Sequence, residues 1–92
     1  MRFAVALSKT LPTSVLMTLA TDDSWRVRCI VAEKRSVDRA VRELLAKDEH
    51  EGVRSAIAWN RKTPTDILRK MINDPIARIA EYVKERLVEV ID

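Results

Sequence analysis

The chain has 92 residues, of which 47% are hydrophobic and 34% charged, so it reads as one globular domain over residues 1–92 and not as a disordered chain. A net charge of +3 is too small to indicate nucleic-acid binding by itself, and the single cysteine, Cys29, excludes an internal disulfide. Few aromatic residues, one glycine and the absence of period-2 alternation favour helices over strands.

Matching residues recur every 26 positions along the chain. Three sets show the period: Ala6, Ala32 and Ala58; Asp22, Asp48 and Asp74; Leu19, Leu45 and Met71. A period of this length is typical of solenoids, in which each unit buries its apolar face against its neighbours. We therefore expect an all-α solenoid with helix-pair repeats at about 4–26, 27–52 and 53–75, followed by a capping helix at about 76–91.

Each repeat contains a signal for the start of its longer helix. Pro12 marks it in the first repeat, Ser36 is the expected N-cap in the second, and Asp38 stands there in place of proline. In the third repeat we expect Thr63 to cap the helix and Pro64 to be its first residue, because proline lacks the N–H that is unsatisfied there.

The apolar spacing predicts which side chains face inward. In the second repeat the predicted inward face is Val37, Val41, Leu44 and Leu45. In the final helix it is Ile76, Ile79, Ala80, Val83, Leu87 and Ile91. The amino-terminal end begins with Phe3, Val5 and Leu7 and has no polar cover, so pairing of two copies through this end is an expectation.

The third repeat resembles the leucine-rich repeat variant family, whose members are HEAT-like helical repeat proteins. The residues that carry the resemblance are Val53-Arg54, Ile57-Ala58, Asn60, Thr63-Pro64, Leu68, Met71 and Asp74. The resemblance implies a right-handed superhelix of longer and shorter helices, and it implies no common reaction. Some family members hold an iron–sulfur cluster on an added cysteine-rich segment, which a chain with Cys29 alone excludes.

An aspartate and an arginine recur together near each repeat boundary. Residues that hold the same position in successive repeats are called a column here: one column is Asp22, Asp48 and Asp74, and the other is Arg28, Arg54 and Arg78. The last aspartate and arginine are closer in sequence than the earlier pairs, so we expect the pattern to change after Asp74. Such columns form either an acid ladder or anion site, or a structural ladder in which aspartate caps a helix and arginine bonds the next repeat. We interpret them as scaffold.

Cations recur at the bend within each predicted helix pair. Lys9, Arg35 and Arg61 hold the same repeat position, flanked by Lys34 and Lys62. Aligned in space, they form either a basic edge that binds an acidic protein or phosphates, or a solvated surface. The sequence leaves both interpretations open.

Trp59 occupies a position held by Leu7 and Glu33 in the other repeats, which is not a uniform core position. It is either an interface anchor or a partly buried packing residue. Trp25 lies in an inter-repeat turn, and exposure of both tryptophans discriminates between the two interpretations. The candidate partner-binding residues are Lys9, Lys34, Arg35, Trp59, Arg61 and Lys62.

No residue pattern supports catalysis. His50 sits in an acidic turn with Glu49 and Glu51, where a metal site or a dyad with Cys29 can be drawn, but adjacent turn residues seldom converge on one atom. We expect a solvated loop there, and no cofactor or metal. The expected function is binding of another protein by a cytoplasmic module. The alternative is nucleic-acid backbone binding by Lys9, Arg35 and Arg61.

Overall fold

A computed structural model describes residues 11–91 of the chain. Within this range the secondary structure is entirely helical, and no strand occurs. The helices are α2 (Thr13–Ala20), α3 (Trp25–Glu33), α4 (Arg39–Leu45), α5 (Glu51–Trp59), α6 (Thr65–Arg69) and α7 (Ala77–Ile91). The expectation of an all-α fold is confirmed for the described residues.

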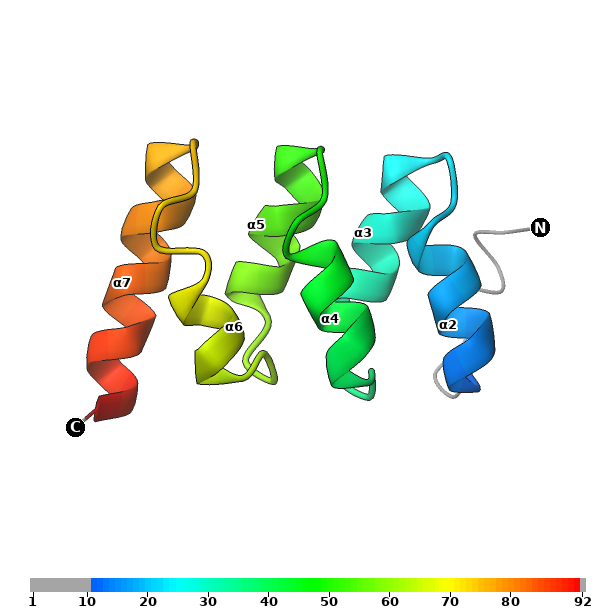
Figure 1. The fold of residues 1–92 in the computed structure, drawn as a ribbon, viewed down its shortest axis with the longest axis horizontal. Coiled ribbons are helices and arrows are strands. Elements are labelled where there is room, and N and C mark those ends of the chain that lie inside the picture. Colours follow the sequence, from blue (N-terminus) through cyan, green and yellow to red (C-terminus); the bar gives the residue numbers. More distant parts are fainter. Residues whose placement is uncertain (1–10, 92) are drawn as a thin grey trace.

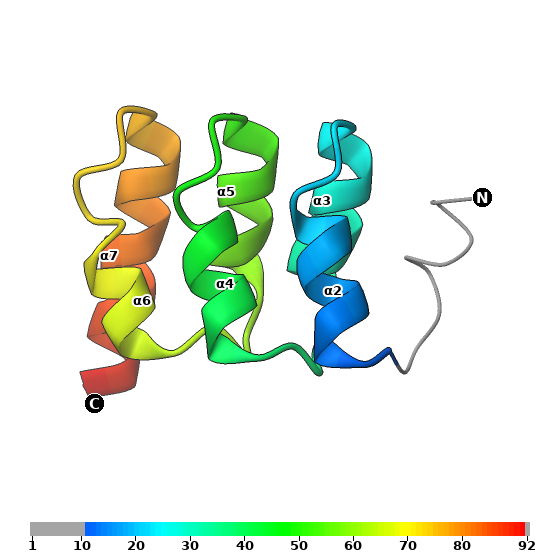
Figure 2. The ribbon, with the colours of Figure 1, turned by 45° about the vertical axis from the view of Figure 1, so that its right-hand side comes forward.

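The helices lie in two rows (Figures 1 and 2): α2, α4 and α6 form the row of shorter helices, and α3, α5 and α7 form the row of longer helices. The expectation that the helix starting near Pro12, Ser36 or Thr63 is the longer one of its pair is therefore wrong. In the longer row α3 packs on α5 and α5 on α7, while α2 packs on α3 and α6 on α7 across the rows. The array measures 40 × 24 × 16 Å. Because the chain passes back and forth between the rows, the connections between the described helices lie on two opposite edges of the array.

The two edges are defined by their connections (Figure 1). The turn edge contains residues 21–24, 46–50 and 70–76, which lead from the shorter to the longer row. The bend edge contains residues 34–38 and 60–64, which lead back. On the turn edge the 26-residue spacing persists beyond Asp74, since α3, α5 and α7 begin at residues 25, 51 and 77. The prediction that the repeat pattern changes after Asp74 is therefore wrong for the position at which α7 begins, which keeps the 26-residue spacing.

Apolar side chains at matching positions fill the space between the rows. The buried sets on the longer row are Val27, Val53 and Ile79, followed by Val31, Ile57 and Val83. The shorter row contributes Leu16 and Leu68, followed by Leu19, Leu45 and Met71. Full burial of each large aliphatic side chain stabilises the fold by about 1.5–3 kcal/mol before the entropy of ordering is counted. The core thus depends on neighbouring helices and not on any single pair.

The inward face of α4 differs from the prediction. Val41 and Leu45 are buried and Val37 is half-buried, but Leu44 is 41% exposed. Arg42 takes the remaining inward position and is only 3% exposed. The inward face is centred near residue 45, between residues 41 and 42, and residue 44 lies beyond residue 41 on the side away from residue 42.

The Arg42 guanidinium holds the preceding bend from inside the protein. Its Nη2 donates to the carbonyl of Arg35 at 2.9 Å and to that of Lys34 at 3.4 Å, and its Nε donates to the carbonyl of Val37 at 3.3 Å. Its Nη1 is buried and has no hydrogen-bond partner among the described residues. Burial lowers the pKa of Arg42, because the charged form loses solvation.

Two predicted helix starts are shifted in the structure. The N-cap positions are Asp38 and Pro64 instead of Ser36 and Thr63, and neither makes a side-chain capping bond. The Thr63 hydroxyl instead donates to the carbonyl of Ile57 at 2.7 Å, near the end of α5. Thr63 therefore closes the preceding helix rather than opening the next one.

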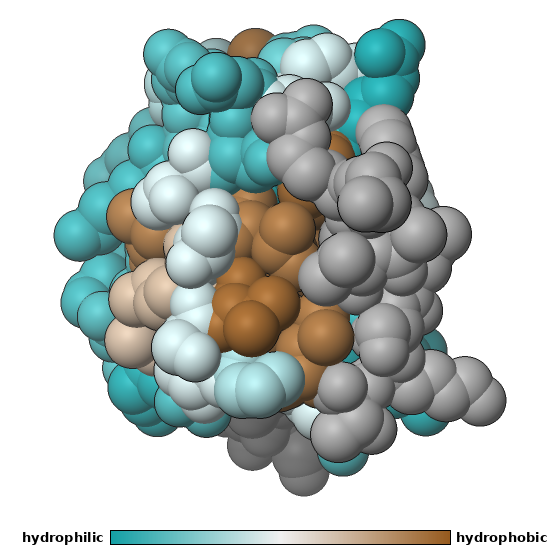
Figure 3. All heavy atoms as spheres, turned by 90° about the vertical axis from the view of Figure 1, so that its right-hand side faces the viewer, coloured by the Kyte–Doolittle hydropathy of each residue, from teal (hydrophilic) through white to brown (hydrophobic). Residues whose placement is uncertain are grey.

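Figure 3 shows the array from the end that carries α2, where apolar side chains come to the surface between polar ones. The apolar residues predicted to pair two copies, Phe3, Val5 and Leu7, lie outside the described residues. At the opposite end α7 buries Ile79, Ala80 and Val83, as predicted for the final helix. None of the described helices combines the length and the apolar character needed to span a bilayer.

Candidate binding surface at the bend edge

The turn edge is held by arginines that join consecutive helix pairs. Arg28 pairs with the Asp48 carboxylate, with Nε–Oδ2 at 2.7 Å and Nη2–Oδ1 at 3.1 Å. Its Nη1 donates to the carbonyls of Asp22 and Asp23 at 2.7 and 3.2 Å. The hydrogen bond from Asp48 raises the pKa of Arg28, because it favours the charged guanidinium.

The same arrangement recurs one step along the array. Arg54 contacts the Asp74 carboxylate, with Nε–Oδ2 at 2.8 Å, and its Nη1 donates to the carbonyls of Asp48 and Glu49. The matching position in α7 is Ala80, so the prediction that Arg78 belongs with Arg28 and Arg54 is wrong.

The aspartates of the turn edge also organise their own turns. Oδ1 of Asp22, Asp48 and Asp74 accepts the backbone N–H two residues later, at 2.9 Å in each case. Each aspartate thereby fixes the entry into a helix of the longer row. The contacts agree with the interpretation of these columns as scaffold.

A second ladder holds the bend edge, and sequence reasoning missed it. The Asn60 amide nitrogen donates to the carbonyls of Ala32 and Lys34 at 2.9 and 2.8 Å. Arg86, 26 residues later, donates in the same way to the carbonyls of Ala58 and Asn60 at 2.6 and 2.9 Å. Because the two donors differ in chemical type, similarity between repeats cannot reveal the column; only the 26-residue spacing marks it.

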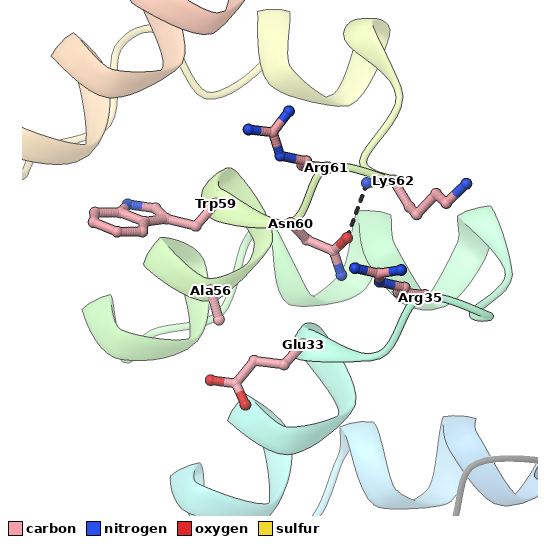
Figure 4. A pocket seen from close by; sticks show the side chains of 7 residues that line it. All are labelled: Glu33, Arg35, Ala56, Trp59, Asn60, Arg61 and Lys62. Atoms are coloured by element: carbon pink, nitrogen blue, oxygen red, sulfur yellow. Dashed lines mark hydrogen bonds between the residues drawn. The ribbon is translucent and has the colours of Figure 1, made fainter.

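Four of the predicted binding residues line one hollow of about 540 Å³, which we call the bend hollow (Figure 4). They are Arg35, Trp59, Arg61 and Lys62, and Glu33 lines it with them. All four are exposed. The structure thus brings together cations from two bends that are 26 residues apart.

Lys34 does not line this hollow: it is half-buried, and its carbonyl accepts hydrogen bonds from Asn60 and Arg42. The remaining predicted residue, Lys9, lies outside the described residues. The Lys62 backbone N–H donates to Oδ1 of Asn60 at 2.9 Å, so the bend that carries Arg61 and Lys62 is fixed by the same side chain that holds the Lys34 carbonyl.

Trp59 stands at one side of the bend hollow and is 57% exposed. Its indole stacks on the ring of Tyr82, with centroids 4.9 Å apart and planes 23° apart. Figure 4 shows Trp59 pointing to one side of Asn60, while Arg35 and Lys62 lie on the other. The hollow therefore has an aromatic side and a basic side, and the side chains that line it do not converge on one point.

Trp25 is 38% exposed and stacks on His50, with ring centroids 4.1 Å apart and planes 8° apart. His50 is half-buried, and its Nδ1 accepts the N–H of Gly52 at 2.9 Å at the start of α5. A Cβ on Gly52 would lie 3.0 Å from the His50 ring, so this contact favours glycine. The expectation that His50 lies in a solvated loop is wrong, because the ring caps a helix and packs on an indole. Both tryptophans are exposed, the observation that favours an interface role.

The described residues contain no group of three or more histidine, cysteine and acidic side chains able to hold a metal ion. Cys29 is half-buried, and burial is the main cause of its raised pKa, because it disfavours the thiolate. His50 directs its Nδ1 to Gly52, so the arrangement leaves that nitrogen no role toward Cys29.

Comparison of the chain with family models, with curated proteins and with solved structures found no match. Membership of the leucine-rich repeat variant family stays a prediction from the third repeat.

Proposed function

We propose that this chain is a non-enzymatic binding module that recognises another protein through the bend hollow. In this proposal the two helical rows constitute a short right-handed α-solenoid of three helix-pair repeats with a capping helix. The bend edge then presents one continuous surface to the partner. The observation that carries the proposal is the gathering of Arg35, Trp59, Arg61 and Lys62 around one hollow.

The chemistry of the hollow supports a protein partner. Tryptophan and arginine are enriched among the residues that dominate binding energies at interfaces. Arg35, Arg61 and Lys62 form no ion pair with another described residue, so they are available to carboxylates of a partner. The contacts made by Asn60 hold both bends in place, which lowers the entropy lost on binding.

The test replaces Trp59 with alanine and Arg61 with glutamate in one variant. We expect partner capture from a cell extract to be lost, while circular dichroism and the melting temperature stay near wild type, because both side chains are exposed. The matched control combines Val88→Ala with Lys84→Glu, which also removes an exposed apolar side chain and reverses an exposed cation, both on α7 and outside the bend hollow. Capture that survives in the first variant places the contact surface elsewhere.

A second candidate function is binding to the backbone of a nucleic acid. It is favoured by the exposed cations Arg35, Arg61 and Lys62 on one hollow, with Lys9 as the residue of the same column outside the described part. Glu33 in the same hollow opposes it. Phosphate binding weakens steeply with salt. An electrophoretic shift assay at two salt concentrations decides: no shift at low salt removes this candidate.

A further inference from the structure

A second hollow, of about 370 Å³, adjoins the bend hollow on the surface of α3 and α5. Both tryptophans line it, and we call it the tryptophan hollow. Glu33, Ala56 and Trp59 line both hollows, so the two adjoin at these residues. A partner segment seated in one would therefore reach the other.

The two hollows differ in charge. Three cations and Glu33 line the bend hollow. Two carboxylates, Glu33 and Glu51, line the tryptophan hollow with one guanidinium, Arg78. Carboxylates beside an indole face are the combination that attracts a guanidinium or ammonium group, by charge and by the cation–π interaction.

The walls of the tryptophan hollow are fixed by contacts within the protein. Trp25 is held by the His50 ring stacked on it, and the guanidinium of Arg26 lies 5.0 Å from its ring centroid. Trp59 is held by Tyr82, which lines neither hollow, so the part of the indole away from Tyr82 faces them. Because His50 and Arg26 already contact Trp25, Trp59 offers the more open indole surface.

We propose that the tryptophan hollow receives a lysine or arginine side chain of a partner protein, whose neighbouring acidic residues contact the bend hollow. The occupant is thus a segment of mixed charge, and the order of its charges fixes its direction along α5. This inference rests on the proposed protein-binding function and specifies the chemistry of the partner. The volume lies within the range of sites that hold small ligands, of about 300–1,000 Å³, and is suited to one side chain.

The experiment uses three short peptides in place of the unidentified partner: acetyl-Gly-Arg-Gly-amide, the same peptide with norleucine, and the same peptide with aspartate. Each is titrated into ¹⁵N-labelled chain while the amide and indole N–H signals are followed by NMR. We expect the arginine peptide to shift the Trp59 indole signal and the amides of residues 51–56. The aspartate peptide is expected to shift residues 35, 61 and 62 instead. Equal binding of the norleucine peptide at the tryptophan hollow overturns the proposal of a cationic occupant.

Charge variants sharpen the test. The double change Glu33→Gln and Glu51→Gln is expected to weaken the arginine peptide about fivefold, as expected for two exposed charge pairs. Arg78→Gln is expected to strengthen it about twofold, because the competing cation is removed. The matched control is Glu81→Gln, an exposed carboxylate of α7 that lines neither hollow. Unchanged affinity in the double variant contradicts the inference.

The peptide result is separable from the proposed function. If the arginine peptide fails to bind but Trp59→Ala with Arg61→Glu still abolishes capture, the partner uses the surface with a different chemistry. If the peptide binds and capture is unaffected by the double change, the proposed function fails, while the tryptophan hollow remains a site that binds a cationic side chain.

Discussion

The turn edge and the bend edge both join consecutive helix pairs, but they do so through different contacts. On the turn edge each step repeats one pair, arginine with the next aspartate, and the charges neutralise each other: Arg28 with Asp48, and Arg54 with Asp74. On the bend edge the carbonyls are held by Asn60 and by Arg86. The cations Arg35, Arg61 and Lys62 form no ion pair with described residues.

The comparison separates columns that serve packing from columns that are free for binding. The aspartates of the turn edge are held by the arginines of the preceding helix pair. Arg35 and Arg61 also recur at one position, but the described residues offer them no carboxylate partner. We therefore expect substitutions at the turn edge to change stability and those at exposed bend residues to change binding.

The largest expected effect comes from breaking the turn-edge ladder. Arg54→Met leaves the Asp74 carboxylate, whose side chain is 4% exposed, without its guanidinium. We expect the free energy of unfolding to fall by about 3 kcal/mol, because a buried charge loses its partner. Urea denaturation measures this. The matched control is Arg61→Met on the bend edge, expected within about 0.5 kcal/mol of wild type. Equal losses in both variants would abolish the distinction between the edges.

The bend-edge ladder gives a smaller effect. Asn60→Ala removes two hydrogen bonds to the carbonyls of Ala32 and Lys34, and the expected loss is about 1–2 kcal/mol. Asn73→Ala changes an exposed asparagine of the turn edge and serves as the control. Because Asn60 also fixes the Lys62 backbone, the Asn60 variant is expected to weaken partner capture as well. Stability equal to that of the Asn73 variant would show that the carbonyl contacts are unimportant.

His50 sharpens the comparison on the turn edge, where it is the cap of α5. His50→Ala removes the acceptor of the Gly52 N–H, and we expect a loss of about 1 kcal/mol in thermal or urea unfolding. His50→Asn restores a capping acceptor and is expected to recover most of the loss. Failure of asparagine to do better than alanine would assign the stabilisation to the stacking on Trp25 instead.

The smallest effect concerns an exposed contact between α4 and α6. The hydrogen bond from Arg39 lowers the pKa of Asp66, because it favours the charged carboxylate. The contact therefore stabilises the fold above the unfolded-state pKa and is lost as the pH falls through the lowered value. In Arg39→Ala the pKa of Asp66, followed by ¹³C NMR, is expected to rise toward its ordinary range. An unchanged titration would show that the contact does not persist in solution.

Sequence reasoning predicted the helical class and the scaffold role of Arg28 and Arg54, because both depend on residue patterns that recur at a fixed spacing. It also named four residues that line the bend hollow, because the cations among them recur at the same spacing.

The errors arose where one side chain departs from its column. Arg42 takes the position of Leu16 and Leu68, and it displaces Leu44 from the predicted core. Hydropathy cannot predict a buried guanidinium, because its burial depends on carbonyls that only the folded bend supplies. The tryptophan hollow was missed because its lining residues are brought together by the packing of α3 on α5.

The most direct test of the two-edge account is an NMR titration of the ¹⁵N-labelled chain with a tetra-aspartate peptide. The account predicts amide shifts confined to residues 34–36 and 60–63, because Arg35, Arg61 and Lys62 form no ion pair with a described carboxylate. Shifts that are largest at residues 46–50 or 70–76, where Asp48 and Asp74 already hold Arg28 and Arg54, would contradict it.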